Sequence, residues 1–574
     1  MAARSQWIIE KTEAVSSGGM VTAMQPDAAD AGAEILRRGG TAIDAAIAIA
    51  FAVGVVEPFM SGVGGLAFLI HRDGATGETV CLDGSAFLPA AISPDLFELL
   101  PGDQRSGLYG WRATVDDAAN TGWLAPAVPG MPALCDEAHQ RWGRLDWGDL
   151  LAPAIDLAAN GFEINHYVAM MTAAAYDRLG RTPESKRTFF KPSGAPFSPA
   201  LGGAAERLVQ ADLARTLDVI AREGARTVYD GEIAELIAAD MKRNGGVMTL
   251  EDLNAHRTLE YAPTAISYRD AEVLGQLPNT GDATVMEALR IVEGFDLESL
   301  GYQSAEATHL IIEAIRRAFL DRLKWLGDES LQPVPYDGVI SPEYAAERRK
   351  RLDPNAATPD ITAGEPWPFD PAEAGPDSSP RPGAGGEGQT THINVIDRDH
   401  NMVSLTSTLG ASFGSAVVVK DTGITLNNGT MWFDPEPGAV TSIGPNKRVL
   451  SAASPALLMR EGKPLAAIGA PGGRRVISSV YQVVLNLVDF QLGMQRSISA
   501  PRVHSEGPGV EISTRFPDAT IEGLEQMGHR LTLREDSLSS SFFARPSGIM
   551  IDGTAGVLRA GVHPYTPATA VGVE

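Results

Sequence analysis

Thr390 stands where a long tract of small and acidic residues gives way to an apolar segment. Residues 353–389 are dominated by Pro, Gly, Ala, Ser and acidic side chains, a composition that buries too little apolar surface to fold tightly. Residues 390–396 and 402–409, separated by a polar turn, form a pattern typical of a β-hairpin. A long mobile tract is an unusual connection into a buried strand. It makes sense if the backbone before Thr390 must be accessible and is then cut.

Cleavage between Gln389 and Thr390 would give the threonine a chemistry that it otherwise lacks. A threonine hydroxyl is a weak nucleophile near neutral pH and needs a nearby base. A newly freed α-amine has an unperturbed pKa close to neutrality, so it can accept the hydroxyl proton directly or through a water. One residue would then supply both nucleophile and base. Taken alone, a threonine at this place is more often an ordinary strand residue.

The elements expected to position this residue follow from hydrophobic periodicity. Residues 26–40 read as a helix that opens at a proline and ends at two glycines. Residues 42–56 are apolar but too few to span a bilayer, and they contain Asp44, which favours a buried helix. Residues 66–70 read as a buried strand, and the apolar positions of 305–326 recur at helical spacing, as in a core helix.

Motifs on both sides of Thr390 resemble, in order, those of the gamma-glutamyltransferase family. In the C-terminal part they are Gln389-Thr390-Thr391-His392, Leu426-Asn427-Asn428, Gly444-Pro445-Asn446-Lys447-Arg448, Ala470-Pro471-Gly472-Gly473 and Ala500-Pro501-Arg502. In the N-terminal part they are Ala31-Gly32-Ala33, Val55-Val56-Glu57-Pro58, Val128-Pro129-Gly130 and Ala318-Phe319-Leu320-Asp321-Arg322. Because the matches extend over nearly the whole chain, the resemblance is specific.

The resemblance implies an α+β fold, the four-layer αββα sandwich of N-terminal-nucleophile hydrolases. It divides the chain into a large-subunit region, 1–352, a flexible segment, 353–389, and a small-subunit region, 390–574. In this family the precursor cuts itself, and the two fragments remain one folded body. The expected ligand is a small-molecule amide, and the resemblance leaves a homo-oligomer open.

The resemblance also assigns catalytic roles. The Thr408 hydroxyl would hydrogen-bond to Thr390, and the backbone N–H groups of Gly472 and Gly473 would stabilise the oxyanion. Glycine suits the second role because it lets the backbone approach a substrate closely. The pair Arg474-Arg475 after this turn would suit a phosphate loop, but no complete nucleotide-binding signature accompanies it.

The positions that bind a γ-glutamyl group in the family are altered. Ser85 stands where the family has an arginine for the substrate α-carboxylate, and a serine offers no charged fork. Gly429 and Trp432 replace a polar pair that receives the α-amine. The other positions assigned to substrate binding are Gly410 in place of an asparagine, Asn428, Ser451, and Ala452 in place of a serine.

An enzyme with an intact nucleophile set but no γ-glutamyl clamp is expected to be an amidohydrolase or acylase that does not select glutathione. Trp432 and Phe433 either line an apolar acyl pocket or anchor a buried loop. Arg448, Arg474 and Arg475 are candidates for a replacement carboxylate binder, although family members with the normal clamp also carry the first. The alternatives are a true γ-glutamyl hydrolase or transpeptidase with a rebuilt clamp, and an uncut, non-catalytic family member.

Composition excludes other classes of function. The formal net charge of −25 and a sequence pI near 4.8 repel phosphate backbones and anionic membranes, so neither nucleic acid nor a membrane is an expected partner. The two cysteines, Cys81 and Cys135, form no disulfide framework, and no His/Cys cluster has metal-ligand spacing. We therefore expect no metal and no cofactor. Without a recognisable leader at its N-terminus, the protein is expected to be cytoplasmic.

Overall fold

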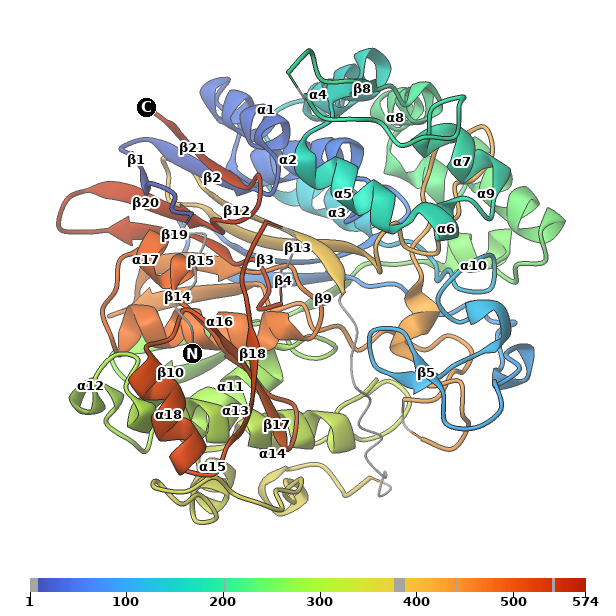
Figure 1. Cartoon of the computed structure of the whole chain (residues 1–574). Helices are drawn as coiled ribbons and strands as arrows, with labels where there is room; N and C mark the ends of the chain where they lie inside the picture. Colours follow the sequence, from blue (N-terminus) through green and yellow to red (C-terminus); the bar gives the residue numbers. More distant parts are fainter. Residues whose placement is uncertain (1–8, 201, 376–387, 440, 539–541) are drawn as a thin grey trace.

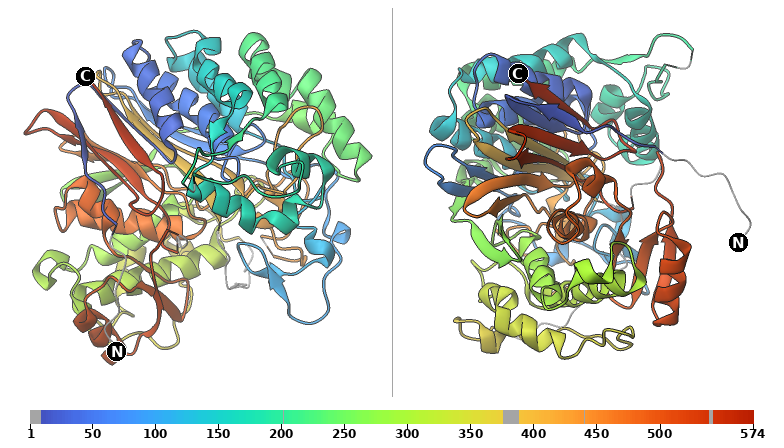
Figure 2. Two further views of the ribbon diagram at one scale, coloured as in Figure 1. Left: turned by 45° about the horizontal axis from the view of Figure 1, so that its top comes forward. Right: turned by 90° about the vertical axis from the view of Figure 1, so that its left-hand side faces the viewer.

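Two β-sheets lie face to face with helices on the outer side of each, in a computed structural model that describes residues 9–200, 202–375, 388–439, 441–538 and 542–574 (Figure 1). The views in Figure 2 show the same order of helices, sheet, sheet and helices. This arrangement confirms the expected αββα sandwich. Of the tract predicted to be mobile, residues 353–389, the part 376–387 lies outside the described residues, whereas 353–375 and 388–389 are described.

Each of the two sheets has seven strands, and neighbouring strands within a sheet pair antiparallel. The first sheet, in spatial order, consists of β1 (Ala14–Ser16), β20 (Val557–Val562), β19 (Ser547–Asp552), β15 (Lys463–Gly469), β14 (Ala456–Arg460), β11 (Ala271–Gly275) and β10 (Thr264–Tyr268). The second consists of β21 (Thr569–Val573), β2 (Gly19–Ala23), β12 (Gln389–Ile396), β13 (Met402–Gly410), β3 (Leu66–Arg72), β4 (Thr79–Gly84) and β9 (Leu259–Tyr261). The predicted hairpin 390–409 is therefore β12–β13, at the centre of the second sheet.

The helices form two groups. Those on the side of the second sheet are α1 (Pro26–Arg37), α2 (Ala42–Val56), α3 (Met131–Trp142), α4 (Trp147–Asn160), α5 (His166–Ala174), α6 (Tyr176–Leu179), α7 (Pro183–Phe189), α8 (Ala211–Glu223), α9 (Glu232–Arg243) and α10 (Leu250–Ala255). Those on the side of the first sheet are α11 (Asp282–Val292), α12 (Leu297–Leu300), α13 (Ala305–Trp325), α14 (Tyr336–Ile340), α15 (Pro342–Arg349), α16 (Arg475–Val488), α17 (Met494–Ser499) and α18 (Asp518–Gln526). The helices predicted over 26–40, 42–56 and 305–326 are confirmed.

Short elements complete the chain outside the two sheets. A small three-stranded sheet consists of β16 (Val503–His504), β17 (Gly509–Ser513) and β18 (Arg530–Arg534). In the small two-stranded sheets, β5 (Arg105–Ser106) pairs with β6 (Trp111–Arg112), and β7 (Phe162–Glu163) pairs with β8 (Arg207–Leu208). Within the described residues, the 3₁₀ turns are η1 (Pro94–Leu96), η2 (Val115–Asp117), η3 (Ala225–Val228), η4 (Trp367–Phe369) and η5 (Gly429–Trp432).

Helix α2 anchors the hairpin that carries Thr390. Every residue of α2 is buried, and its N-terminus is closed by a capping box between Thr41 and Asp44. Asp397, at the end of β12, accepts a hydrogen bond from the Ala42 N–H at 2.9 Å. A cap of this kind stabilises a helix by about 1 kcal/mol because it satisfies an N–H that has no partner within the helix. The same carboxylate accepts from the Asn401 N–H in the hairpin turn, so helix and hairpin are joined at one residue.

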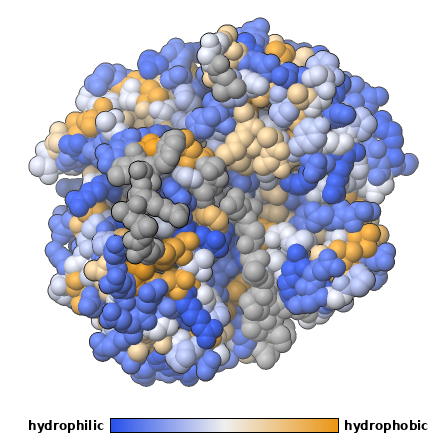
Figure 3. Space-filling model, in the orientation of Figure 1, coloured by the Kyte–Doolittle hydropathy of each residue, from blue (hydrophilic) through white to orange (hydrophobic). Residues whose placement is uncertain are grey.

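The face of the molecule shown in Figure 3 is mainly polar. Hydrophilic side chains predominate on the face shown in Figure 3, and hydrophobic ones are scattered over it. Among the described residues, no helix combines the length and the apolar character needed to cross a membrane.

Candidate active site

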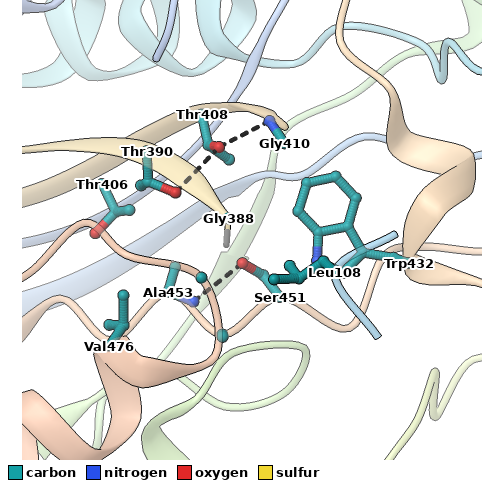
Figure 4. A pocket seen from close by; sticks show the side chains of 12 residues that line it. Leu108, Gly388, Thr390, Thr406, Thr408, Gly410, Trp432, Ser451, Ala453 and Val476 are labelled. Atoms are coloured by element: carbon teal, nitrogen blue, oxygen red, sulfur yellow. Dashed lines mark hydrogen bonds between the residues drawn. The ribbon is translucent and has the colours of Figure 1, made fainter. Parts of the chain in front are cut away.

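The strand pairing around Thr390 is irregular in a way that brings two hydroxyl groups together. Gln389 pairs with Gly410 and Thr391 pairs with Ser407, so two residues of β13 lie opposite the single residue Thr390. An extra residue of this kind forms a β-bulge, which bends a strand and re-aims a side chain. As a result, the Oγ1 atoms of Thr390 and Thr408 lie 3.2 Å apart (Figure 4).

The Thr408 hydroxyl uses all of its hydrogen-bonding capacity at the proposed cleavage site. It donates to the carbonyl oxygen of Gln389 at 2.6 Å and accepts from Thr390 Oγ1 and from the Gly410 N–H, the last at 2.9 Å. A hydroxyl has one proton and two lone pairs, so these three contacts saturate it. Both threonines are buried, Thr390 with 8% of its surface exposed and Thr408 with 3%. The proposed nucleophile and the carbonyl before it are therefore bridged by one side chain.

A neutral histidine, His392, links β12 to β13 next to the Thr390–Thr408 pair. His392 Nε2 lies 3.1 Å from Asn394 Oδ1, and its Nδ1 lies 2.9 Å from the Thr406 hydroxyl. Burial lowers the pKa of His392 to about 4, so the ring is uncharged at neutral pH. Gly469 on β15 leaves no room for a Cβ atom against this ring, which explains a glycine there. The imidazole thus fixes Thr406 by hydrogen bonding and packs between the two sheets.

The glycine turn before α16 faces the same place. Gly472 and Gly473 have φ of 142° and 59°, values that side chains rarely adopt. Gly388, just before the proposed cleavage site, packs on Gly473, where a Cβ atom on Gly388 would lie 2.5 Å from the Gly473 Cα. The N-terminus of α16, with its partial positive charge, begins two residues later at Arg475.

Substituting Gly472 with alanine should disrupt this turn. A Cβ atom at Gly472 would lie 2.6 Å from the Cα of Ala544, and backbone cannot move aside easily. We expect the turn to shift and turnover to fall about 10²-fold, the size of effect known for loss of an oxyanion donor. Steady-state kinetics of Gly472→Ala would measure this. Gly462→Ala is the matched control, because that glycine also has positive φ but has open space around it. Equal activity of Gly472→Ala and the wild type would contradict the role of the turn.

A small pocket opens at Thr390 and gathers most of the residues predicted for the site. Its lining consists of Leu108, Gly388, Thr390, Thr406, Thr408, Gly410, Trp432, Ser451, Ala452, Ala453, Gly473 and Val476 (Figure 4). Of the predicted site residues, Ser85, Gln389, Asn428, Gly429 and Gly472 are not among them. Apart from the three threonines and Ser451, the lining side chains are mainly apolar, and none of the lining residues is charged.

Ser85 and Arg448 lie together outside this lining. The Arg448 guanidinium donates to the Ser85 hydroxyl at 3.2 Å, and Ser85 is fully buried. Arg448 lines a different cavity with Asp328 and Glu329. The Arg448 guanidinium is therefore hydrogen-bonded to Ser85, the serine that stands where the family has an arginine.

The two arginines after the glycine turn are engaged in ion pairs. Arg474 lies 2.9 Å from Glu506, and Arg475 lies 2.9 Å from Glu511. The Arg474 guanidinium also stacks over the Tyr109 ring. Neither arginine lines the Thr390 pocket.

Asn428 and Gly429 shape the loop that carries Trp432. Asn428 Oδ1 accepts from the Ala411 N–H at 2.9 Å, and its amide donates to the Asn120 carbonyl at 3.0 Å. Gly429 packs against Ala127 with no space for a side chain. The two residues thus hold the loop, while Trp432 reaches the pocket.

Trp432 both lines the pocket and anchors a buried loop, the two roles that the sequence left open. Its ring lines the pocket, and the atoms at its edge would lie 3.0 Å from a Cβ atom on Gly410. It also belongs to an apolar cluster with Phe433 and Leu108, and its side chain is 6% exposed. Phe433 is part of that cluster and lies outside the pocket lining.

Comparison with known proteins identifies the family. The family model described as gamma-glutamyltranspeptidase matches residues 28–573. The chain belongs to this family. A glutathione hydrolase proenzyme of Bacillus subtilis (strain 168) is 31% identical over 562 residues, covering 98% of this chain and 92% of the relative. The acylase ACY 1 proenzyme of Pseudomonas sp. (strain SE83) is 35% identical over 526 residues, covering 91% and 88%.

Solved structures of gamma-glutamyltranspeptidase-family proteins agree. The crystal structure of cephalosporin acylase from Bacillus halodurans has a TM-score of 0.85 and 30% identity, covering 100% of this chain and 99% of that one. The gamma-glutamyltranspeptidase of Helicobacter pylori has a TM-score of 0.54 and 31% identity, covering 62% of this chain and 95% of that one. The chain is accordingly an amide hydrolase or acyltransferase of the gamma-glutamyltranspeptidase family.

Five pocket residues were not predicted as site residues by the sequence analysis: Leu108, Gly388, Thr406, Ala453 and Val476. Thr406 carried a usable signal, because it lies two residues before Thr408 on a strand and alternate residues share a face. Leu108 carried none, since it comes from a loop far from Thr390 in sequence. Its place in the pocket depends on how that loop packs.

Proposed function

We propose that this chain is a self-processing N-terminal threonine amidohydrolase that cuts itself between Gln389 and Thr390. The arrangement around Thr408 carries the proposal, because one hydroxyl contacts both the proposed nucleophile and the carbonyl oxygen of Gln389. The two relatives described above, a glutathione hydrolase proenzyme and an acylase proenzyme, support a processing step.

The contacts suggest a route for self-cleavage. Thr390 Oγ1 attacks the Gln389 carbonyl carbon and passes its proton to Thr408, which passes its own to the carbonyl oxygen. Collapse of the tetrahedral intermediate breaks the peptide C–N bond, and the Thr390 nitrogen takes up the proton. The product is an ester between Gln389 and the Thr390 hydroxyl. Water then hydrolyses this ester to a Gln389 carboxylate and a free Thr390 with an α-amine.

In turnover the freed α-amine takes the proton from Thr390 Oγ1 as the hydroxyl attacks the substrate amide. The backbone N–H groups of Gly472 and Gly473 face the developing oxyanion in this proposal. The α-amine then protonates the leaving amine, and water releases the acid from the acyl-enzyme. Gly388 lies in the pocket of the uncut chain, so the segment before the cleavage site must leave before a substrate can enter.

The acyl group, in this proposal, lacks the charged α-carbon of a γ-glutamyl substrate. Trp432, one of the two positions where the resemblance implies polar groups for the α-amine, lines the pocket beside Gly410, and an indole beside an ammonium offers no hydrogen-bond acceptor. No charged side chain lines the pocket within the described residues. Burying an unpaired ammonium or carboxylate there is unfavourable, since each loses its hydration. A neutral acyl chain avoids this cost, which supports an acylase activity in this proposal.

Three p-nitroanilides that differ by one group each test this specificity. The γ-glutamyl compound carries an ammonium and a carboxylate, the glutaryl compound only the carboxylate, and the butyryl compound neither. We expect kcat/KM to rise about tenfold or more from γ-glutamyl to butyryl, because each charged group left unpaired costs more than about 1 kcal/mol. The highest kcat/KM for γ-glutamyl would instead support a true γ-glutamyl hydrolase with a rebuilt clamp.

Replacing Trp432 with aspartate should shift this preference. A carboxylate at that position can pair with the substrate ammonium, so the ratio of γ-glutamyl to butyryl kcat/KM should rise about tenfold or more. Trp432→Asn is the matched control, because it opens the same space without the charge. A similar ratio in the two variants would show that the ring does not decide the recognition of the α-amine.

A further inference from the structure

The side chain of Gln389 points away from the Thr390 pocket, into a buried polar contact. Gln389 and Thr391 share the face of β12 that is opposite to Thr390, because side chains alternate along a strand. Gln389 is 5% exposed, and its Oε1 accepts from Arg545 Nη2 at 3.0 Å. A neutral amide next to the proposed cleavage site is thus held by a charged donor, which makes a stronger hydrogen bond than a neutral one.

Arg545 is itself rigidly placed. It is 1% exposed, and its guanidinium also donates to the Tyr167 hydroxyl and lies 3.8 Å from Met60 Sδ. The fully buried Glu57 carboxyl belongs to the same environment: burial raises the pKa of Glu57 to about 7, and the charge of Arg545 opposes the rise. A guanidinium fixed on several sides can restrain the residue that it binds.

The same residue contacts the glycine turn through its backbone. The Arg545 N–H donates to the Pro471 carbonyl at 2.9 Å. The preceding Ala544, with φ of 62°, packs directly against Gly472. Arg545 therefore links the turn at Gly472 to the residue whose peptide bond is to be cut, although it lies 156 positions from Gln389 in sequence.

We propose that Arg545 is a positioning residue for self-cleavage, which acts by holding the Gln389 side chain. This inference rests on the proposed cleavage before Thr390. Gln389 has its side chain fixed by Arg545 and its carbonyl oxygen fixed by Thr408, 2.6 Å away. Because the side chain and the carbonyl oxygen of Gln389 are both restrained, its carbonyl carbon stays next to Thr390 Oγ1. A fixed near-attack geometry of this kind speeds an intramolecular reaction. Loss of the side-chain contact lets the peptide rotate away from the hydroxyl.

The test follows the rate of self-cleavage after cell-free synthesis, with the cut fraction measured by intact mass over time. Gln389→Met keeps the length and loses the acceptor, so it should cleave about tenfold or more slowly than the wild type. Gln389→Glu keeps an acceptor oxygen and should cleave at least about fivefold faster than Gln389→Met. Gln495→Met makes the same chemical change at a buried glutamine that bonds to the Val562 carbonyl, and should cleave like the wild type.

Arg545→Met should slow cleavage as Gln389→Met does, and the double variant should be no slower than the slower single variant, because both remove one contact. Thermal unfolding identifies any variant that fails to fold, and in that case the two Gln389 variants decide alone. Wild-type cleavage by Gln389→Met, or equal rates for Gln389→Met and Gln389→Glu, would overturn this inference and leave the proposed function standing. An uncut wild-type chain would overturn both.

Discussion

Thr390→Ala should yield a single uncut chain, whereas the wild type separates into fragments 1–389 and 390–574. Alanine has no hydroxyl to attack the Gln389 carbonyl, so self-cleavage and amide hydrolysis should both fall by at least about 10⁴-fold. Intact-mass analysis of the purified proteins measures the first effect, and p-nitroanilide turnover measures the second. Thr390→Ser should still cut itself, because serine keeps the hydroxyl.

Thr391→Ala is the matched control for this result. Thr391 is the next residue, is fully buried as well, and points to the opposite face of β12. It should be cut at the wild-type position. A well-folded wild-type chain that stays in one piece would contradict the nucleophile assignment and favour a non-catalytic family member. Cleavage of Thr390→Ala at the same bond would assign the reaction to another group.

Thr408→Val should slow self-cleavage by about 10²-fold to 10³-fold. Valine has nearly the shape of threonine but neither donates to the Gln389 oxygen nor accepts from Thr390, two contacts of 2.6 and 3.2 Å. It also leaves the Gly410 N–H without its acceptor. Removing one donor to a developing oxyanion commonly costs this much in rate. The measurement is the cut fraction over time after synthesis.

Two variants separate this chemistry from packing. Thr408→Ser restores the hydroxyl and should recover most of the rate. Thr406→Val removes the neighbouring hydroxyl of the same pocket, which contacts His392 and not the Gln389 carbonyl, and should slow cleavage much less. If Thr406→Val and Thr408→Val were equally slow, the specific bridge through Thr408 would be wrong.

Local patterns in the sequence were sufficient for the elements near the site. The small apolar residues of 42–56 predict a buried helix, and the strand-like segments 390–396 and 402–409 with the turn between them predict a hairpin; both elements are present. Asp44, which favoured a buried helix over a membrane span, closes the capping box with Thr41. These signals are readable because they involve residues within one or two turns or strand repeats of one another.

Position in a family motif was a weaker guide to contact with the pocket. Gly410, Trp432 and Ser451 line it, whereas Ser85 and Asn428 hydrogen-bond to other parts of the protein. The motif places a residue in the chain, but it does not say which way the side chain points after neighbouring residues have changed. Ser85 is shorter than the arginine it replaces, and Arg448 bonds to it.

The sequence by itself predicted the strand that presents Thr390, and its resemblance to the family predicted the sandwich fold and the proposed nucleophile. Only the tertiary structure decided that a bulge in β13 sets the Thr408 hydroxyl between Thr390 and the Gln389 carbonyl. Only the tertiary structure brought Leu108 into the pocket and Arg545 to Gln389. The physical reason is that periodicity records which face of an element is buried, while contacts between distant segments depend on how the sheets, turns and loops pack together.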